Sequence, residues 1–148
     1  MGIVALVQFF HTKFLRKVGC KMGKIMVIIN RKGGCGKSFT AMSLGVGLAR
    51  KGKKVLIIDT DNQHSLTISM GVTEPDKLPV TIASVIMDII AKKEIDPAAG
   101  IIHHVEGIDL MPANNMLTGI EHALAPQIGR ETIFCGILTR LVRCMIMF

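Results

Sequence analysis

The feature that most constrains this chain is a glycine-rich loop between an apolar run and a helix-like stretch. Residues 32–38 read Lys-Gly-Gly-Cys-Gly-Lys-Ser, directly after Ile25–Ile29 and directly before Phe39–Lys51. Glycines allow the backbone to turn back with its N–H groups pointing inward, and a helix that begins there adds a positive dipole end that favours phosphate. The order of strand, loop and helix therefore predicts an α/β fold with an anion site at its first turn.

The polar residues of the loop have the chemistry that a bound triphosphate and its metal ion require. Lys37 supplies a point charge for the β- and γ-phosphates, and Ser38 supplies a hydroxyl ligand for Mg²⁺. The ordinary phosphate-loop pattern would place its first glycine where this chain has Arg31, and an additional lysine, Lys32, stands at the loop entrance. The alternative interpretation is a glycine-rich turn that binds no ligand.

Two acidic residues follow the second apolar run, Val55–Ile58. Open parallel sheets bind ligands at the carboxyl ends of their strands, so Asp59 and Asp61 are expected at the same edge of the sheet as the loop. Because side chains alternate along a strand, both carboxylates are expected on the same side. From these residues alone, a helix cap or a solvated charge is the alternative for each acid.

Taken together, these segments resemble one family. Residues 32–38 are similar to the deviant Walker A loop of the ParA/Soj and MinD group of ATPases. Residues 55–63, which end in Asp-Thr-Asp-Asn-Gln, and residues 107–114, which end in Pro-Ala-Asn, resemble segments of the ParA/Soj branch, with Thr67 also in place. The resemblance covers about residues 22–141 and implies an α/β fold of the P-loop NTPase type, a parallel sheet flanked by helices.

The resemblance also assigns roles to single residues. Lys32, Lys37 and Asp61 are expected to be catalytic: Lys32 reaches the partner's phosphates in a nucleotide-sandwich dimer, and Asp61 positions the attacking water. Magnesium is expected at Ser38, with Asp59 supporting its shell. The residues expected to bind ATP are Lys32, Gly33, Gly34, Cys35, Gly36, Lys37, Ser38 and Phe39.

Three positions depart from the family pattern. Asn62 replaces the usual proline, His64 the usual glycine, and Phe39 a common threonine. We expect the first two changes to alter the rigidity of the loop after Asp61, and the third to remove one hydroxyl contact to phosphate. None of them is expected to move the site.

The implied function is Mg²⁺-dependent ATP binding and hydrolysis that drives ATP-dependent dimerisation in plasmid or chromosome partitioning. The expected partners are ATP, a second copy of the chain, a partition protein of the ParB type and non-specific DNA. The expected location is the cytoplasm, at the nucleoid, without membrane association. Two alternatives are a MinD-like membrane-associated ATPase and a nucleotide-binding remnant without turnover.

Composition and charge agree with this class. The 49% hydrophobic content of the 148 residues excludes a disordered chain, and the absence of Trp and Tyr leaves an aliphatic composition suited to a buried parallel sheet. The net charge of +7 is uneven, because residues 1–58 contain twelve Lys or Arg and no acid. Such charge is compatible with an anion or nucleic-acid site and also with a solvated basic face. The four cysteines lack the spacing of a zinc site, which favours reduced thiols.

Hydrophobic patterns predict the elements that carry these motifs, within one domain. Short apolar runs predict strands at Ile25–Ile29, Val55–Ile58 and Ile108–Met111. Helical spacing predicts helices at Phe39–Lys51 and Thr81–Lys93. Gly52 is expected to end the first helix and Thr81 to cap the second.

The two ends are expected to differ from the rest. Residues 1–21 are predicted to be an N-terminal extension outside the fold, with a segment lying on an anionic membrane surface as the alternative. Residues 22–141 are predicted to form the N-terminal part of a ParA-type ATPase domain, and residues 142–148 an aberrant, frameshifted tail.

A missing segment motivates the last of these expectations. In the family, the Walker B strand ending in Asp-x-Pro-Pro pairs beside the phosphate-loop strand, and this sequence contains no such segment. We therefore expect an incomplete sheet, a phosphate-loop strand without a partner, and an inactive fragment; a natural short protein is the alternative.

Overall fold

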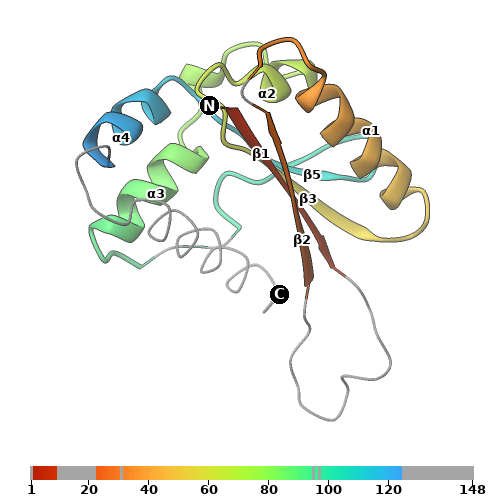
Figure 1. Cartoon of the computed structure of the whole chain (residues 1–148). Helices are drawn as coiled ribbons and strands as arrows, with labels where there is room; N and C mark the ends of the chain where they lie inside the picture. The colour runs from red at the N-terminus through yellow and green to blue at the C-terminus, as the bar shows by residue number, and fades with distance from the viewer. Residues whose placement is uncertain (1, 10–22, 31, 95, 97, 125–148) are drawn as a thin grey trace.

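Strands in the described part of the chain form one five-stranded sheet in the order β2-β1-β3-β5-β4, with helices on both faces (Figure 1). The structure is a computed structural model that describes residues 2–9, 23–30, 32–94, 96 and 98–124. Among these residues, none of the helices combines the length and the apolar character that a membrane-spanning helix needs. In chain order the elements are β1 (Gly2–Phe9), β2 (Gly23–Asn30), α1 (Lys37–Ala49), β3 (Lys54–Asp59), α2 (Ser65–Ser69), the 3-10 helix η2 (Pro75–Lys77), α3 (Ile82–Ile90), β4 (Ile102–His103), β5 (Asp109–Met111) and α4 (Met116–Leu124).

The three strands predicted from the sequence are β2, β3 and β5, and they run parallel to one another. β1 pairs antiparallel with both β2 and β3, which makes β2 and β3 parallel, and β3 pairs parallel with β5. The predicted α/β fold is confirmed. The sheet is mixed, however, because β1 and β4 run antiparallel to their neighbours.

β1, an inner strand between β2 and β3, comes from the segment predicted to lie outside the fold. It pairs with all eight residues of β2 and with β3 from Val4 to Phe9. The expectation for residues 1–21 therefore does not hold for residues 2–9, and β2 does not lack a partner. The physical reason is that Gly2–Phe9 is an uncharged run rich in β-branched residues, whose backbone satisfies the N–H and C=O groups of two strands at once. The boundaries predicted near residues 21 and 142 lie outside the described residues.

Two hydrophobic clusters cover opposite faces of β3. Leu56 and Ile58 belong to the cluster that includes α3 and α4, whereas Val55 and Ile57 belong to the cluster that includes α1 and α2. Figure 1 shows α1 on one side of the sheet and α3 and α4 on the other. A strand buried on both faces is typical of the centre of an α/β fold, and it places the carboxyl end of β3, Asp59, inside the protein.

The predicted helices are present, with ends shifted by a few residues. α1 begins at Lys37, ahead of the predicted Phe39, and Gly52 follows its end at φ +72°, in the left-handed region that favours glycine. α3 begins directly after Thr81, which is the predicted N-cap. It forms a capping box in which the Thr81 N–H donates to Ser84 Oγ over 3.0 Å.

Candidate functional site

The glycine-rich loop turns on two glycines between β2 and α1. Gly34 and Gly36 have φ +69° and +81°, backbone angles that residues other than glycine rarely adopt. The Lys32 N–H donates to Asn30 Oδ1 over 3.0 Å, and the Thr40 N–H donates to the Gly36 carbonyl over 2.8 Å. Local hydrogen bonds thus hold both ends of the loop, and the glycines provide the reversal that the sequence predicts.

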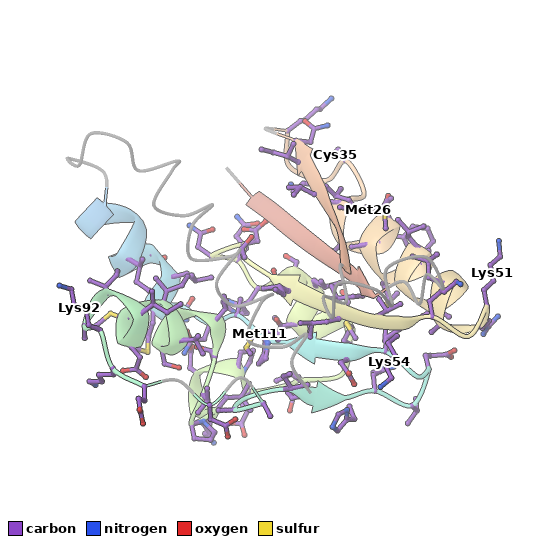
Figure 2. The ribbon with its side chains drawn as sticks, turned by 90° about the horizontal axis from the view of Figure 1, so that it is seen from below. Met26, Cys35, Lys51, Lys54, Lys92 and Met111 are labelled. Atoms are coloured by element: carbon purple, nitrogen blue, oxygen red, sulfur yellow. The ribbon has the colours of Figure 1, made fainter. Side chains whose placement is uncertain are left out.

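The N-terminus of α1 is open to an anion. Gly36 is its N-cap, no side chain caps the helix, and its first turn contains no acidic residue. The first N–H groups of a helix have no intrahelical partner and carry positive partial charge. Lys37 and Ser38 are half-buried, whereas residues 32–36 are exposed, and Figure 2 shows Cys35 at the outer end of the loop. The loop therefore offers N–H groups, an ammonium group and a hydroxyl group to a phosphate.

Phe39, one of the residues expected to bind ATP, has its ring in solvent. The exposed fraction of Phe39 is 70%. It lies in the first turn of α1, and the residues that α1 buries, Ala41 and Gly45, belong to the opposite face of the helix. An exposed ring at this position adds nothing to the hydrophobic clusters. It lies next to the loop on the surface.

Asp59 lies at the end of β3 and is fully buried. Its Oδ2 accepts hydrogen bonds from the Thr67 N–H at 2.9 Å and from Thr67 Oγ1 at 2.7 Å, and its Oδ1 accepts one from the Asp61 N–H at 3.1 Å. Burial raises the pKa of the Asp59 carboxyl above 3.8, while the hydrogen bonds from Thr67 and Asp61 lower it and the Asp61 charge raises it further. The charged form is thus stabilised by three donors but penalised by the loss of water.

Asp61 has a more open position at the start of the following turn. It is half-buried, its Oδ1 accepts a hydrogen bond from the Gln63 N–H at 3.1 Å, and its carbonyl accepts one from the His64 N–H at 2.9 Å. His64, where the family has glycine, adopts φ +42°. This left-handed conformation costs a non-glycine residue about 1–2 kcal/mol. The turn after Asp61 is therefore formed despite the substitution, with strain at His64.

Thr67 connects this turn to β5, a connection that sequence reasoning missed. Its Oγ1 donates to Asp59 and accepts a hydrogen bond from the Ala113 N–H at 3.0 Å. Asn114 Oδ1 in turn accepts from Thr81 Oγ1 at 3.1 Å. The Pro-Ala-Asn segment is thus part of a buried network that holds α2 and α3 to the sheet. The only sequence signal was that Thr67 matched the family pattern.

The loop and the two acids lie at the same end of the sheet, because β2 and β3 run parallel. Val4 of β1 pairs with Ile28 on one side and with Asp59 on the other, so Asp59 is level with Ile28 of β2. Two strand spacings separate them, about 10 Å between their backbones. The loop begins just beyond Asn30, two residues further along β2, so it projects past Asp59 at the carboxyl edge.

The side chains predicted to serve magnesium suit a site completed by the nucleotide. Within the described ranges, no group of three or more His, Cys, Asp or Glu residues is arranged to hold a metal ion by itself. Mg²⁺ usually keeps several waters and binds one or two protein groups together with substrate phosphates. The Ser38 hydroxyl fits direct coordination. Asp59 already accepts three hydrogen bonds, so it fits a role through a water ligand.

Comparison with known proteins identifies the family. The family model AAA_31, described as an AAA domain, matches residues 23–143. The chain belongs to this AAA domain family. It is 38% identical over 110 residues to the sporulation initiation inhibitor protein Soj of Bacillus subtilis, covering 74% of this chain and 42% of that protein. It is 34% identical over 110 residues to the chromosome-partitioning ATPase Soj of Thermus thermophilus, covering 73% of this chain and 40% of that protein.

A third relative belongs to the ParA branch. The chromosome partitioning protein ParA of Caulobacter vibrioides is 31% identical over 108 residues, covering 73% of this chain and 39% of that protein. The resemblance to ParA and Soj proteins is therefore confirmed. The chain spans about two fifths of the length of these curated relatives.

Solved structures agree with the fold of this AAA domain chain. Cobyrinic acid a,c-diamide synthase from Mycobacterium smegmatis with bound ADP and magnesium matches with a TM-score of 0.64 and 38% identity, covering 76% of this chain and 44% of that one. The same enzyme with a bound ATP analogue and magnesium matches equally well, at a TM-score of 0.64. Both neighbours thus hold an adenine nucleotide together with magnesium.

We predict that the stability of the chain carries a pH dependence that Asp59→Asn removes. Because the folded pKa of Asp59 lies above 3.8, the folded state binds more protons than the unfolded state in the window just above that value. The contribution of Asp59 to stability therefore falls as the pH rises through this window, and it stays low above it. Urea unfolding from pH 4 to 7 should show the parent losing stability relative to Asp59→Asn as the pH rises. If the unfolding free energy of the parent minus that of Asp59→Asn stays constant or rises with pH, the assignment is contradicted.

Proposed function

We propose that this chain binds ATP with Mg²⁺ at residues 32–39 and belongs to an ATPase of the ParA/Soj type, in which binding and hydrolysis drive dimerisation during plasmid or chromosome partitioning. The observation that carries this function is geometric. A loop turned by Gly34 and Gly36 leads into an uncapped helix N-terminus, at the same sheet edge as Asp59 and Asp61. In a site of this kind, backbone N–H groups bind the phosphate, and the carboxylates lie one or two strands away from it.

Each loop residue has a role in this site. The N–H groups of residues 33–38 surround the phosphates, and Lys37 neutralises the charge that develops on them. Ser38 holds Mg²⁺, which supplies further charge neutralisation when bound. Lys32 stands exposed at the loop entrance, where it can reach the phosphates of a second copy across a dimer. Binding and dimerisation are thereby coupled through one lysine.

Asp61 is the residue best placed to align the attacking water. Its Oδ1 accepts from the Gln63 N–H, while its Oδ2 has no hydrogen-bond donor among the residues that the structure describes. A half-buried carboxylate with one unused oxygen can hold and orient a water molecule. Buried Asp59 has no such freedom, since both its oxygens are engaged. The two acids thus separate into a water-positioning group and a structural group that supports the magnesium shell.

The cellular part of the function is carried over from the relatives. Soj of Thermus thermophilus is named as a chromosome-partitioning ATPase and ParA of Caulobacter vibrioides as a chromosome partitioning protein. We extend this to a cytoplasmic protein that acts with a ParB-type partner and with non-specific DNA. The excess of Lys and Arg in residues 1–58 is compatible with an anionic partner.

Lys37→Ala tests the phosphate-binding role. A hydrogen-bonded charge is worth about 1.5–3 kcal/mol, so the affinity for Mg·ATP should fall by about 10- to 150-fold, measured by calorimetric titration of the full chain. Lys51→Ala is the matched control. Figure 2 places Lys51 beyond the end of α1 opposite to Cys35, and its removal should leave the affinity unchanged. Parental affinity in Lys37→Ala would rule out this loop as the phosphate site.

Asp61→Asn tests the water-positioning role. The variant keeps the acceptor for the Gln63 N–H but loses the charge, so ATP binding should persist while hydrolysis falls by about 10²- to 10⁴-fold. Asp96→Asn, at an exposed acid whose Oδ1 accepts from the Ala98 N–H, is the control. Phosphate release and nucleotide affinity are measured side by side. Unchanged turnover in Asp61→Asn would contradict the role, and a parent chain that binds ATP without turnover would favour the nucleotide-binding remnant.

A further inference from the structure

β1 is the lateral connection between the phosphate-loop strand and the rest of the sheet. β2 is followed by α1 and then β3, and this crossover leaves one strand position open between β2 and β3. Gly2–Phe9 fills that position. Within the described ranges, β2 pairs with no other strand. Without β1, α1 would be the main element holding β2 against the sheet.

The register of β1 fixes the site. Gly2 pairs with Asn30, the residue at the end of β2, and Val4 pairs with Asp59, the residue at the end of β3. One strand therefore sets both how far the phosphate loop lies from Asp59 and how far it projects beyond it. If β1 slipped by one residue against β2 or β3, the two strands would shift by about 3.3 Å along one another. The side chains of β1 would then point to the opposite faces of the sheet.

The segment has the composition of a buried central strand but lies outside the family match. Gly2–Phe9 contains no charged residue and includes three β-branched ones, Ile3, Val4 and Val7. The match to the AAA domain family begins at residue 23. A strand in the middle of the sheet is thus supplied by residues that precede the family domain.

We propose that Gly2–Phe9 is a built-in donor strand: it inserts antiparallel between β2 and β3 of its own chain and positions the phosphate loop against Asp59. The occupant of the slot is the chain's own segment, joined to β2 by residues 10–22. The positioning role rests on the proposed nucleotide site, whereas the insertion itself does not. In this proposal, residues 2–9 touch no ligand and act by fixing the position of the phosphate loop relative to Asp59.

Disulfide trapping tests the insertion on the full chain. Ala5→Cys with Val27→Cys joins two directly paired residues, whose Cα atoms lie about 4.5–5.5 Å apart, within the range that a disulfide spans. Ala5→Cys with Ile29→Cys is the matched control, because its partner is displaced by two residues and lies about 8 Å away. Both pairs are made with the four native cysteines replaced by serine. The first pair should form an intrachain disulfide at least about tenfold faster than the second.

Three results would overturn the insertion. They are equal rates for the two pairs, no crosslink in either, and a crosslink that joins two chains, which would mean that a second copy donates the strand. Hydrogen exchange on the unsubstituted chain checks the same point without cysteines. Amides of Gly2–Phe9 should exchange as slowly as those of Lys54–Asp59, since both strands are central. Exchange at the rate of a free peptide would contradict the insertion.

Leu6→Pro tests the positioning role. Leu6 pairs with Met26 and with Ile57, and proline at a central strand position removes a ladder hydrogen bond. At a temperature where circular dichroism shows the chain folded, the Mg·ATP affinity of this variant should fall at least about tenfold, while conservative Leu6→Val retains it. Equal affinities would overturn the positioning role. A parent that is crosslinked as expected but binds no nucleotide would instead contradict the proposed function and leave the inserted strand standing.

Discussion

The buried carboxylate of Asp59 connects three parts of the structure that lie far apart in the chain. It terminates β3, whose two faces pack against different hydrophobic clusters. It accepts two hydrogen bonds from Thr67 and thereby holds α2, and through Thr67 Oγ1 it reaches the Ala113 N–H beyond β5. Each donor offsets part of the desolvation that burial imposes on the charge. The carboxyl edge of the sheet is therefore organised around a single buried acid.

The glycine-rich loop at residues 32–38 is held at this edge by a different kind of interaction. β2 has no direct pairing with β3, and β1 runs between them, antiparallel to both. Backbone hydrogen bonds of one uncharged strand thus set the position of the loop, whereas side-chain hydrogen bonds set the position of the acids. The candidate site depends on both, and it is sensitive to changes in residues 2–9 that touch no ligand.

The sequence was sufficient for the local features and insufficient for the non-local ones. The loop at residues 32–38, the N-cap at Thr81 and the glycine at Gly52 depend on backbone conformations that neighbouring residues dictate, and they were predicted. The pairing of Gly2–Phe9 depends on a slot created by residues some twenty to fifty positions later, so an apolar run alone could not reveal it. The Thr67 network was missed for the same reason: its donors and acceptors come from β3, α2 and the segment after β5.

The most direct test of the account is to find which backbone amides respond to nucleotide. In the full chain labelled with ¹⁵N, titration with Mg·ATP should shift the amide resonances of residues 32–39, which form the loop and the first turn of α1. Smaller shifts are expected at residues 61–63, after β3 at the same edge. Shifts confined to residues 50–54, which follow α1 and include four basic residues, or no shifts at saturating nucleotide, would contradict a nucleotide site at the carboxyl edge of this sheet.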